Sequence, residues 1–199
     1  MSARRILTVL VATVVTCGIS ISAPAQGASP KAKPATAKPE TRPAPVAAGS
    51  AEPTLLGQYG TWGAYAATPN GKKVCFALAR PSSSKTNPPN RPRDPAYAFV
   101  STRPAEKVSN EVSVMIGYTL KPGSESTLEV GGATYAMYTQ GDGLWIKNAA
   151  EEERMVEAMR KSADVVVKGV SAKGTATTDV FSLKGLSQAL DRVAQDCKR

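Results

Sequence analysis

The sequence predicts a mainly β domain, either an antiparallel β-sandwich or a barrel-like sheet, with two late α-helices, the last at the C-terminus. Short stretches of alternating apolar and polar residues recur between residues 59 and 183, separated by Gly, Pro or Asn turns. Two later segments have apolar residues at helical spacing instead. A predicted export signal (1–25) and a Pro-rich segment (26–54) precede the domain, which therefore covers residues 55–199.

Residues 1–25 have the order of a secretory signal peptide. Two arginines precede an apolar run, and the small residues 22–25 end the segment. Cleavage is expected after Ala25 or, as the alternative, after Ala28. The mature chain is therefore expected to be periplasmic or secreted, in oxidising surroundings.

A membrane anchor and a lipid anchor are the alternative interpretations of this segment. The apolar run is only about ten residues long, whereas a spanning helix needs roughly 20. Cys17 is a candidate for lipidation, although Thr16 stands where a lipobox usually has Gly, Ala or Ser. No later stretch is apolar for long enough to cross a bilayer, so we expect no transmembrane span after signal cleavage.

Residues 26–54 are predicted to be a disordered linker rich in Ala, Pro and Lys. The segment has no aromatic residue, and Val46 is its one β-branched aliphatic residue. It cannot bury enough apolar surface to fold. Its prolines favour an extended chain of at most roughly 90 Å. It is either a spacer whose lysines touch an anionic surface or an unconstrained tail.

The predicted strands alternate apolar and polar residues and end at turn residues. They cover 59–67, 72–80, 97–102, 111–120, 127–130, 133–139, 144–146, 164–170 and 175–183. Residues 69–71, Pro-Asn-Gly, predict a hairpin turn. Val74, Phe76 and Leu78 share one face of the second strand, so Cys75 lies on the opposite face.

The first predicted helix begins at Asn148, which fits a capping box with Glu151. The three glutamates at 151–153 also suit the helix dipole, so they need no catalytic or metal-binding explanation. The second helix covers 185–197 and carries Cys197 on its apolar stripe.

Cys75 and Cys197 are predicted to form a disulfide bond. Cys17 leaves with the signal peptide, and an even pair of cysteines in an exported domain indicates a bridge. The bridge closes a loop of about 120 residues and contributes on the order of 4–5 kcal/mol in the chain-entropy model. A free catalytic thiol is the alternative, without a histidine to activate it.

The chain has no histidine. This excludes Ser-His-Asp and Cys-His catalysis, His-ligated zinc and a histidine pH switch. A hydrolase or transferase that works through carboxylates, Ser or Lys remains an alternative. Its candidates by residue type are Asp94, Glu111, Asp142 and Lys147, which no spacing marks. We expect no enzymatic activity, no cofactor and no bound metal.

Residues 81–95 are predicted to be a long loop, since five prolines in this segment exclude helix and strand. The loop carries Lys85, Arg91 and Arg93 in an extended, exposed stretch of a chain whose formal charge is +9. Basic charge favours an anionic partner. We expect an unidentified envelope or host macromolecule and no specific nucleic acid, with a simple solvated connection as the alternative.

Six segments of the folded part carry a family resemblance. They are YGTWGAY, KKVCFALA, AYAFVSTRP, EVSVMIGY, YAMYTQGDGLWIKNAAEE and VFSLKGLSQALDRVAQDC. Together they resemble the invasion-associated locus B family of alphaproteobacterial exported proteins, over residues 55–199. The resemblance implies a small secreted β-rich domain, an envelope or host-interaction role and no known enzymatic reaction. Members often carry a cysteine a few residues after the opening Trp, where this chain has Ala66, which leaves Cys75 and Cys197 as the available pair.

These observations predict an exported, non-enzymatic envelope protein that binds another macromolecule. A periplasmic small-molecule-binding or stress-response module, with its ligand between sheets, is the main alternative. A deep polar pocket with converging carboxylates would indicate an enzyme, whereas a filled core with a basic surface would indicate binding.

Overall fold

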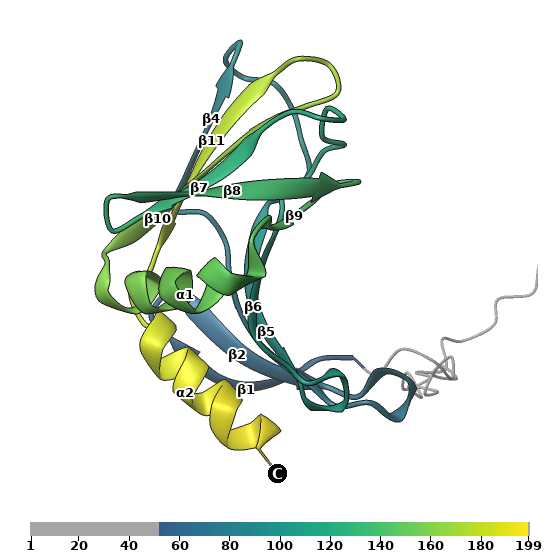
Figure 1. Cartoon of the computed structure of the whole chain (residues 1–199), viewed down its shortest axis with the longest axis vertical. Coiled ribbons are helices and arrows are strands. Elements are labelled where there is room, and N and C mark those ends of the chain that lie inside the picture. Colours follow the sequence, from purple (N-terminus) through teal and green to yellow (C-terminus); the bar gives the residue numbers. More distant parts are fainter. Residues whose placement is uncertain (1–51, 199) are drawn as a thin grey trace, which may run out of the picture. The chain divides into compact units, whose positions relative to one another are not determined.

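The computed structural model describes residues 52–198 (Figure 1). The predicted signal peptide, the lipidation candidate Cys17 and nearly all of the predicted linker lie outside the described residues. In chain order the elements are β1 (Thr54–Tyr59), β2 (Trp62–Ala67), β3 (Val74–Ala79), β4 (Ser83–Asn87), β5 (Tyr97–Arg103), β6 (Val108–Met115), β7 (Ser126–Val130), β8 (Ala133–Gln140), β9 (Gly143–Ile146), α1 (Glu152–Lys161), β10 (Asp164–Val170), β11 (Ala176–Ser182) and α2 (Leu186–Cys197). Short 3₁₀ turns cover Pro69–Gly71, Pro104–Glu106 and Ala149–Glu151.

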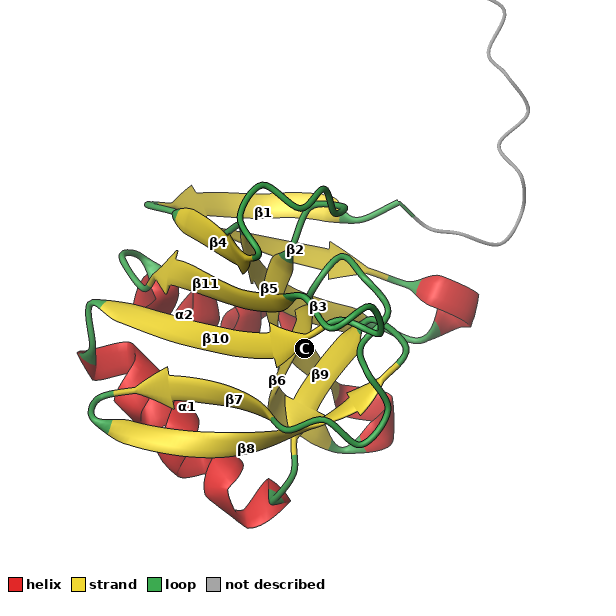
Figure 2. Cartoon of the chain, turned by 90° about the horizontal axis from the view of Figure 1, so that it is seen from above, coloured by secondary structure: helices red, strands yellow, loops and turns green. Residues whose placement is uncertain are grey.

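The eleven strands form one open sheet in the order β1-β2-β3-β5-β6-β9-β8-β7-β10-β11-β4. Every strand pair is antiparallel. The predicted mainly β class with two late helices is therefore confirmed. Because the strands belong to a single sheet, the structure corresponds to the barrel-like alternative and not to a two-sheet sandwich (Figure 2).

The core lies between one face of the sheet and the two helices (Figure 1). Helix α2 packs against β1, β2, β3 and β5, and α1 packs against β6 and β7. Leu186, Leu190 and Val193 of α2 recur at helical spacing and are at most 1% exposed. Trp62 and Phe181, which are fully buried, fill the space beneath this helix layer.

Two strands are absent from the sequence prediction. The first, β1, pairs with β2, so the segment predicted as one strand from Tyr59 is in fact the second half of a hairpin. The second, β4, shows that the prediction of no strand within 81–95 is wrong. Ser83–Asn87 contains no proline, and it pairs on one edge only, with β11. The prolines lie outside this edge strand, so they remove no backbone donor from its hydrogen bonds to β11.

The predicted alternation of β3 is confirmed, and its core side is the cysteine side. Cys75, Ala77 and Ala79 are at most 1% exposed, whereas Phe76 and Leu78 on the other face are half-buried. Small side chains face the core here because α2 packs directly on β3.

The predicted disulfide joins Cys75 of β3 to Cys197 in the last turn of α2. The two Cα atoms are 5.9 Å apart, within the roughly 4.4–6.8 Å that a bridge requires. Beside the bridge, Lys73 Nζ lies 2.9 Å from Asp196 Oδ2 and donates to the Asp196 main-chain oxygen at 2.7 Å.

The turn between β1 and β2 contacts the chain just before α2. Thr61 N donates to Lys184 O at 3.1 Å, and Trp62 Nε1 donates to Ser182 O at 2.9 Å. Gly185 has a φ of +94°, and a Cβ there would lie 1.9 Å from the Tyr59 main-chain oxygen. Glycine is therefore required at this crossing, because any side chain would clash and the backbone conformation would be strained.

Candidate functional site: a basic cleft beside β4

A cleft of about 610 Å³ opens between the β4–β5 loop and the β10–β11 turn. We refer to it as the basic cleft. Its lining residues are Thr86, Pro88, Arg91, Pro92, Arg93, Tyr118, Thr119, Ser171, Ala172, Lys173, Gly174, Thr175 and Thr177. The set combines three cationic side chains with six hydroxyl groups, and it contains no carboxylate.

Arg93 is fixed at the base of the basic cleft by Asp179 of β11. Its Nη1 donates to Asp179 Oδ2 at 2.7 Å and to Ile116 O at 3.1 Å, and its Nη2 pairs with Asp179 Oδ1. Asp179 is fully buried, and the Arg93 side chain is 11% exposed. The prediction that prolines keep Arg93 exposed is therefore wrong, because a carboxylate inside the protein needs a counter-charge and bidentate hydrogen bonds.

Arg91 and Lys173 supply the free positive charge of the basic cleft. Both are exposed, and neither forms an ion pair within residues 52–198. The Arg91 main-chain N–H donates to Thr86 Oγ1 at 3.1 Å, which ties the loop to β4. Lys173 lies in the tight turn where Gly174 N donates to Ser171 O at 2.8 Å. The two cations therefore face the cleft from separate, hydrogen-bonded supports.

Tyr118 forms the aromatic part of the lining. Its hydroxyl lies 2.6 Å from Thr177 Oγ1, and the Arg93 guanidinium lies 6.0 Å from the centre of its ring. Burial raises the pKa of Tyr118 above the ordinary phenol value, against the opposing effects of the Thr177 hydrogen bond and the Arg93 charge. Tyr118 is therefore a neutral hydroxyl that can donate or accept.

The structure separates Lys85 from the other two predicted binding residues. Lys85 pairs with Thr178 of β11, whereas the adjacent Thr86 pairs with Thr177 and lines the basic cleft. Neighbouring residues of a strand point to opposite faces. Arg91 and Arg93 thus meet in the cleft, and Lys85 lies on the other side of β4.

Sequence reasoning missed Lys173, Tyr118 and Asp179. Lys173 stands in the short gap between the predicted strands 164–170 and 175–183, so a basic residue at a turn could have been identified from the sequence. Asp179 occupies an inward position of an alternating strand, and an acidic residue at such a position signals a buried counter-charge. No local sequence pattern indicates the contact between Tyr118 and Thr177, because it joins residues that are distant in sequence and meet only in the folded sheet.

The residues considered for carboxylate chemistry do not line the basic cleft. Glu111 pairs with Arg103, and Asp94, Asp142 and Lys147 are exposed. Among residues 52–198, no group of three or more Cys, Asp or Glu side chains is placed to hold a metal ion.

The predicted capping box between Asn148 and Glu151 does not form, because α1 begins at Glu152 and no side chain caps its N-terminus; Asn148 Oδ1 instead accepts a hydrogen bond from Ala150 N at 3.1 Å. Glu152 Oε1 accepts a hydrogen bond from Val112 N of β6 at 2.7 Å. Pairing between β6 and β9 covers only Ser113–Met115, so Glu152 provides the acceptor for the Val112 N–H group. Burial raises the pKa of Glu152, although the Val112 hydrogen bond opposes this. The side chain joins helix to sheet.

Comparison with known proteins identifies one family. The family model described as Invasion associated locus B (IalB) protein matches residues 62–194, more than half of the chain. No curated protein and no solved structure matches. In the part of the chain from 52 to 198, no helix is long and apolar enough to cross a membrane.

Proposed function

The chain belongs to the Invasion associated locus B family, and from this premise we propose that it binds an anionic macromolecule of the envelope or host through the basic cleft. Family membership indicates an exported bacterial protein. We further propose that the protein is not an enzyme and that it acts in the periplasm or at the cell surface.

The observation that carries the proposal is the charge of the basic cleft. Three of its lining side chains are cationic and none is acidic. Asp179 neutralises Arg93 from below, which leaves Arg91 and Lys173 as uncompensated charges at the opening. Cations that line a concave surface raise the local potential and attract anionic partners.

The hydroxyl groups around these cations favour an oxygen-rich anion. Thr86, Thr119, Ser171 and Thr175 surround Arg91 and Lys173 in the lining. Hydroxyls donate to and accept from sulfate, phosphate and sugar oxygens alike. An acidic glycan or the headgroup region of an anionic lipid assembly has this chemistry.

Retention on a heparin column in a salt gradient tests the proposal. The Arg91→Ala/Lys173→Ala variant is expected to elute at clearly lower salt than the wild type. Its matched control is Lys72→Ala/Lys147→Ala, which also removes two exposed positive charges but leaves the basic cleft intact. Equal losses in the two variants would show that retention follows net charge, and the cleft would be excluded.

A small-molecule-binding module is the second candidate, because the cleft volume of about 610 Å³ falls within the roughly 300–1,000 Å³ of ligand pockets. Its ligand would occupy the cleft, since the single sheet leaves no space between sheets. Thermal stabilisation by inorganic phosphate as large as that by heparin oligosaccharides would favour this candidate. Stabilisation by the oligosaccharides alone would favour a macromolecule.

A further inference from the structure

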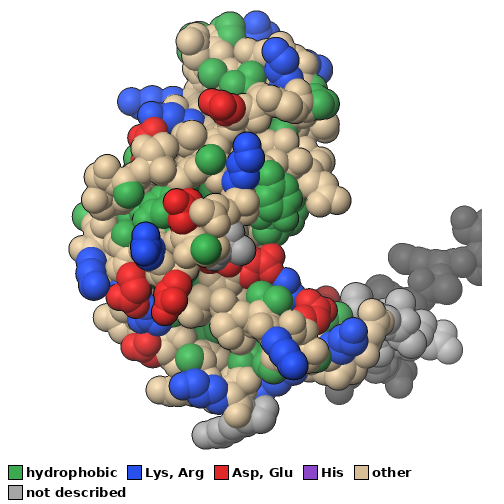
Figure 3. Space-filling view, in the orientation of Figure 1, with side chains coloured by type: hydrophobic (Ala, Val, Ile, Leu, Met, Phe, Trp, Pro, Cys, Tyr) green, Lys and Arg blue, Asp and Glu red, His purple; other side chains and the backbone are tan. Residues whose placement is uncertain are grey.

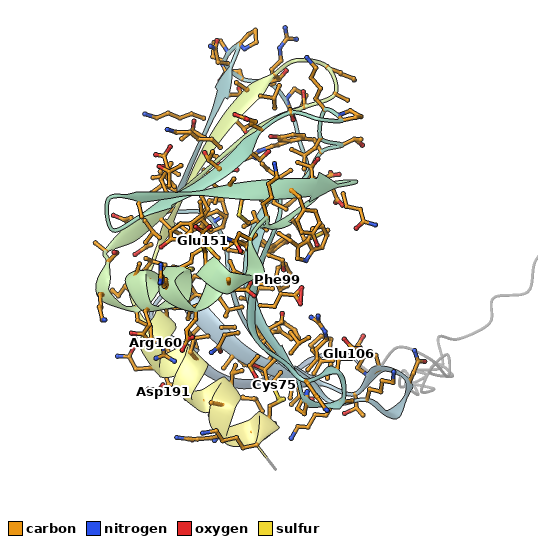
Figure 4. All side chains as sticks on the ribbon, viewed as in Figure 1. Cys75, Phe99, Glu106, Glu151, Arg160 and Asp191 are labelled. Atoms are coloured by element: carbon orange, nitrogen blue, oxygen red, sulfur yellow. A yellow bond between two sulfur atoms is a disulfide. The ribbon has the colours of Figure 1, made fainter. Side chains whose placement is uncertain are left out.

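A row of aromatic and apolar side chains crosses the face of the sheet opposite to α1 and α2. The register places Leu78, Phe99, Ser113, Trp145 and Tyr138 side by side on β3, β5, β6, β9 and β8. Figure 4 labels Phe99 on the side of the sheet away from the helices. We define the aromatic row as these five residues together with Tyr65 of β2 and Phe76 of β3, which are paired with each other.

The rings of the aromatic row are held in fixed positions. Tyr65 and Phe76 stack with centroids 5.4 Å apart, and Tyr138 and Trp145 stack at 5.6 Å. The Trp145 ring occupies the space beside Gly143, where a Cβ would lie 2.3 Å from it. Rings that are already positioned lose little entropy when a partner binds.

Two exposed side chains mark the ends of this surface. Leu55 is 53% exposed and Tyr138 is 46% exposed, and within residues 52–198 they are the exposed large hydrophobic residues. Leu55 pairs with Tyr65 and therefore extends the aromatic row onto β1. Figure 3 shows the surface hollowed on this side. A contiguous apolar patch in a hollow indicates an interaction site.

The chemistry of the aromatic row differs from that of the basic cleft. None of its seven members carries a charge. The nearby Arg80 is engaged by Tyr97, with its guanidinium 5.2 Å from the ring centre and a hydrogen bond of 3.0 Å to the hydroxyl. An apolar, extended occupant suits this surface better than an anion does.

We propose that the aromatic row binds the Pro-rich segment of this same chain, residues 26–51. The segment contains five prolines and no aromatic residue. Pro-rich chains in the polyproline II conformation dock on aromatic-lined grooves, because little conformational entropy is lost. The segment runs directly into β1, where Leu55 stands at the end of the aromatic row, so the row lies within its immediate reach.

The dimensions of the two partners agree. Six strands about 4.8 Å apart, from β2 to β8, make the row about 24 Å long, which about eight polyproline II residues span at about 3.1 Å each. Phe99 and Trp145 are two strands apart, or about 9.6 Å, with the small Ser113 between them. One polyproline II turn of three residues advances about 9.3 Å, so successive turns can fit against successive rings.

The test compares the chain 26–199 with a variant in which prolines 30, 34, 39, 43 and 45 are replaced by alanine. The chain has two tryptophans, and Trp62 is fully buried, so Trp145 reports on the aromatic row. We expect the variant to shift the indole N–H NMR signal of Trp145 and to increase its quenching by acrylamide, while the Trp62 signal stays in place. The substitutions lie outside the described domain, so they leave its folding intact. An unchanged Trp145 in both measurements would overturn the proposal.

Three further variants exclude other occupants. Replacing Lys31, Lys33, Lys38 and Arg42 with glutamine should leave Trp145 as in the wild type; release of Trp145 would show that charge, not proline, makes the contact. Tyr65→Ser, at the opposite end of the aromatic row from Trp145, should increase Trp145 quenching in the same direction as the proline variant. If the wild type sediments as a dimer and Tyr138→Ser as a monomer, a second copy covers the row and the proposal is wrong.

Discussion

Removing the Cys75–Cys197 bridge is expected to lower global stability strongly while α2 stays docked. The thin apolar stripe seen in the sequence suggests that α2 would detach on reduction. The structure instead packs α2 on four strands, with Leu186, Leu190 and Val193 almost fully buried. The last turn, at Cys197, is the part that is expected to loosen.

Two magnitudes decide between these outcomes. The sequence separation of the bridge is 122 residues, which corresponds to about 5 kcal/mol of unfolded-state entropy. Burial of three aliphatic side chains contributes about 1.5–3 kcal/mol each, or about 4.5–9 kcal/mol together. This local packing energy remains after reduction, because it depends on residues in the first two turns of α2. Reduction therefore acts mainly on the unfolded state.

Urea denaturation with and without reductant measures the loss. With an m-value of about 2 kcal/mol/M, the midpoint should fall by roughly 2.5 M, and Cys75→Ala/Cys197→Ala should reproduce this. Lys73→Ala removes the adjacent ion pair with Asp196 and the hydrogen bond to its main-chain oxygen but leaves the bridge intact, and it should cost about 1 kcal/mol. Hydrogen exchange should show the amides of Leu186–Val193 still protected after reduction. A midpoint shift below about 0.5 M, or loss of that protection, would refute the reasoning.

Three further outcomes follow from particular contacts. Arg93→Ala and Asp179→Asn should each lower the free energy of unfolding by about 3–5 kcal/mol, because each leaves a buried partner unpaired. In thermal melts, the double variant should lose clearly less stability than the sum of the two single losses. Strict additivity of the losses would contradict the pairing. Gly185→Ala should destabilise more than Gly174→Ala, because both have positive φ but only the first clashes; equal melting temperatures would disprove the clash. Burial raises the pKa of Glu152, so its protonated form favours folding below the unfolded pKa and that stability is lost as pH rises through the folded pKa. Glu152→Gln should therefore gain melting temperature relative to the wild type as the pH rises from below the ordinary glutamate pKa to neutral pH, and a constant difference would exclude this effect.

The sequence predicted the strands whose apolar residues alternate cleanly, and it missed the two that lack this pattern. In β1 the register shifts between Leu55 and Gly57, so the alternation is interrupted. Strand β4 has no apolar residue at all, and its stability comes from the ladder with β11. Edge strands of this kind depend on a partner strand that is distant in sequence, and no local pattern reveals it.

The candidate site was predictable in location but not in detail. Composition identified the loop that forms one wall of the basic cleft, because prolines and basic residues concentrate there. The burial of Arg93 depends on Asp179, 86 residues later in the chain. The separation of Lys85 from the cleft depends on which residue of β4 pairs with Thr177. Both facts arise from register between distant strands.

The residues that join the start of the domain to its end are different from the residues that give the basic cleft its free positive charge. The contacts from Thr61 to Lys184 and from Trp62 to Ser182, together with the Cys75–Cys197 bridge, join the start of the domain to its end. Arg91 and Lys173 take part in none of them. Their substitution should therefore alter binding without altering the melting temperature. Arg93 differs, because it both lines the basic cleft and neutralises Asp179, so a loss of binding in an Arg93 variant would not separate recognition from folding.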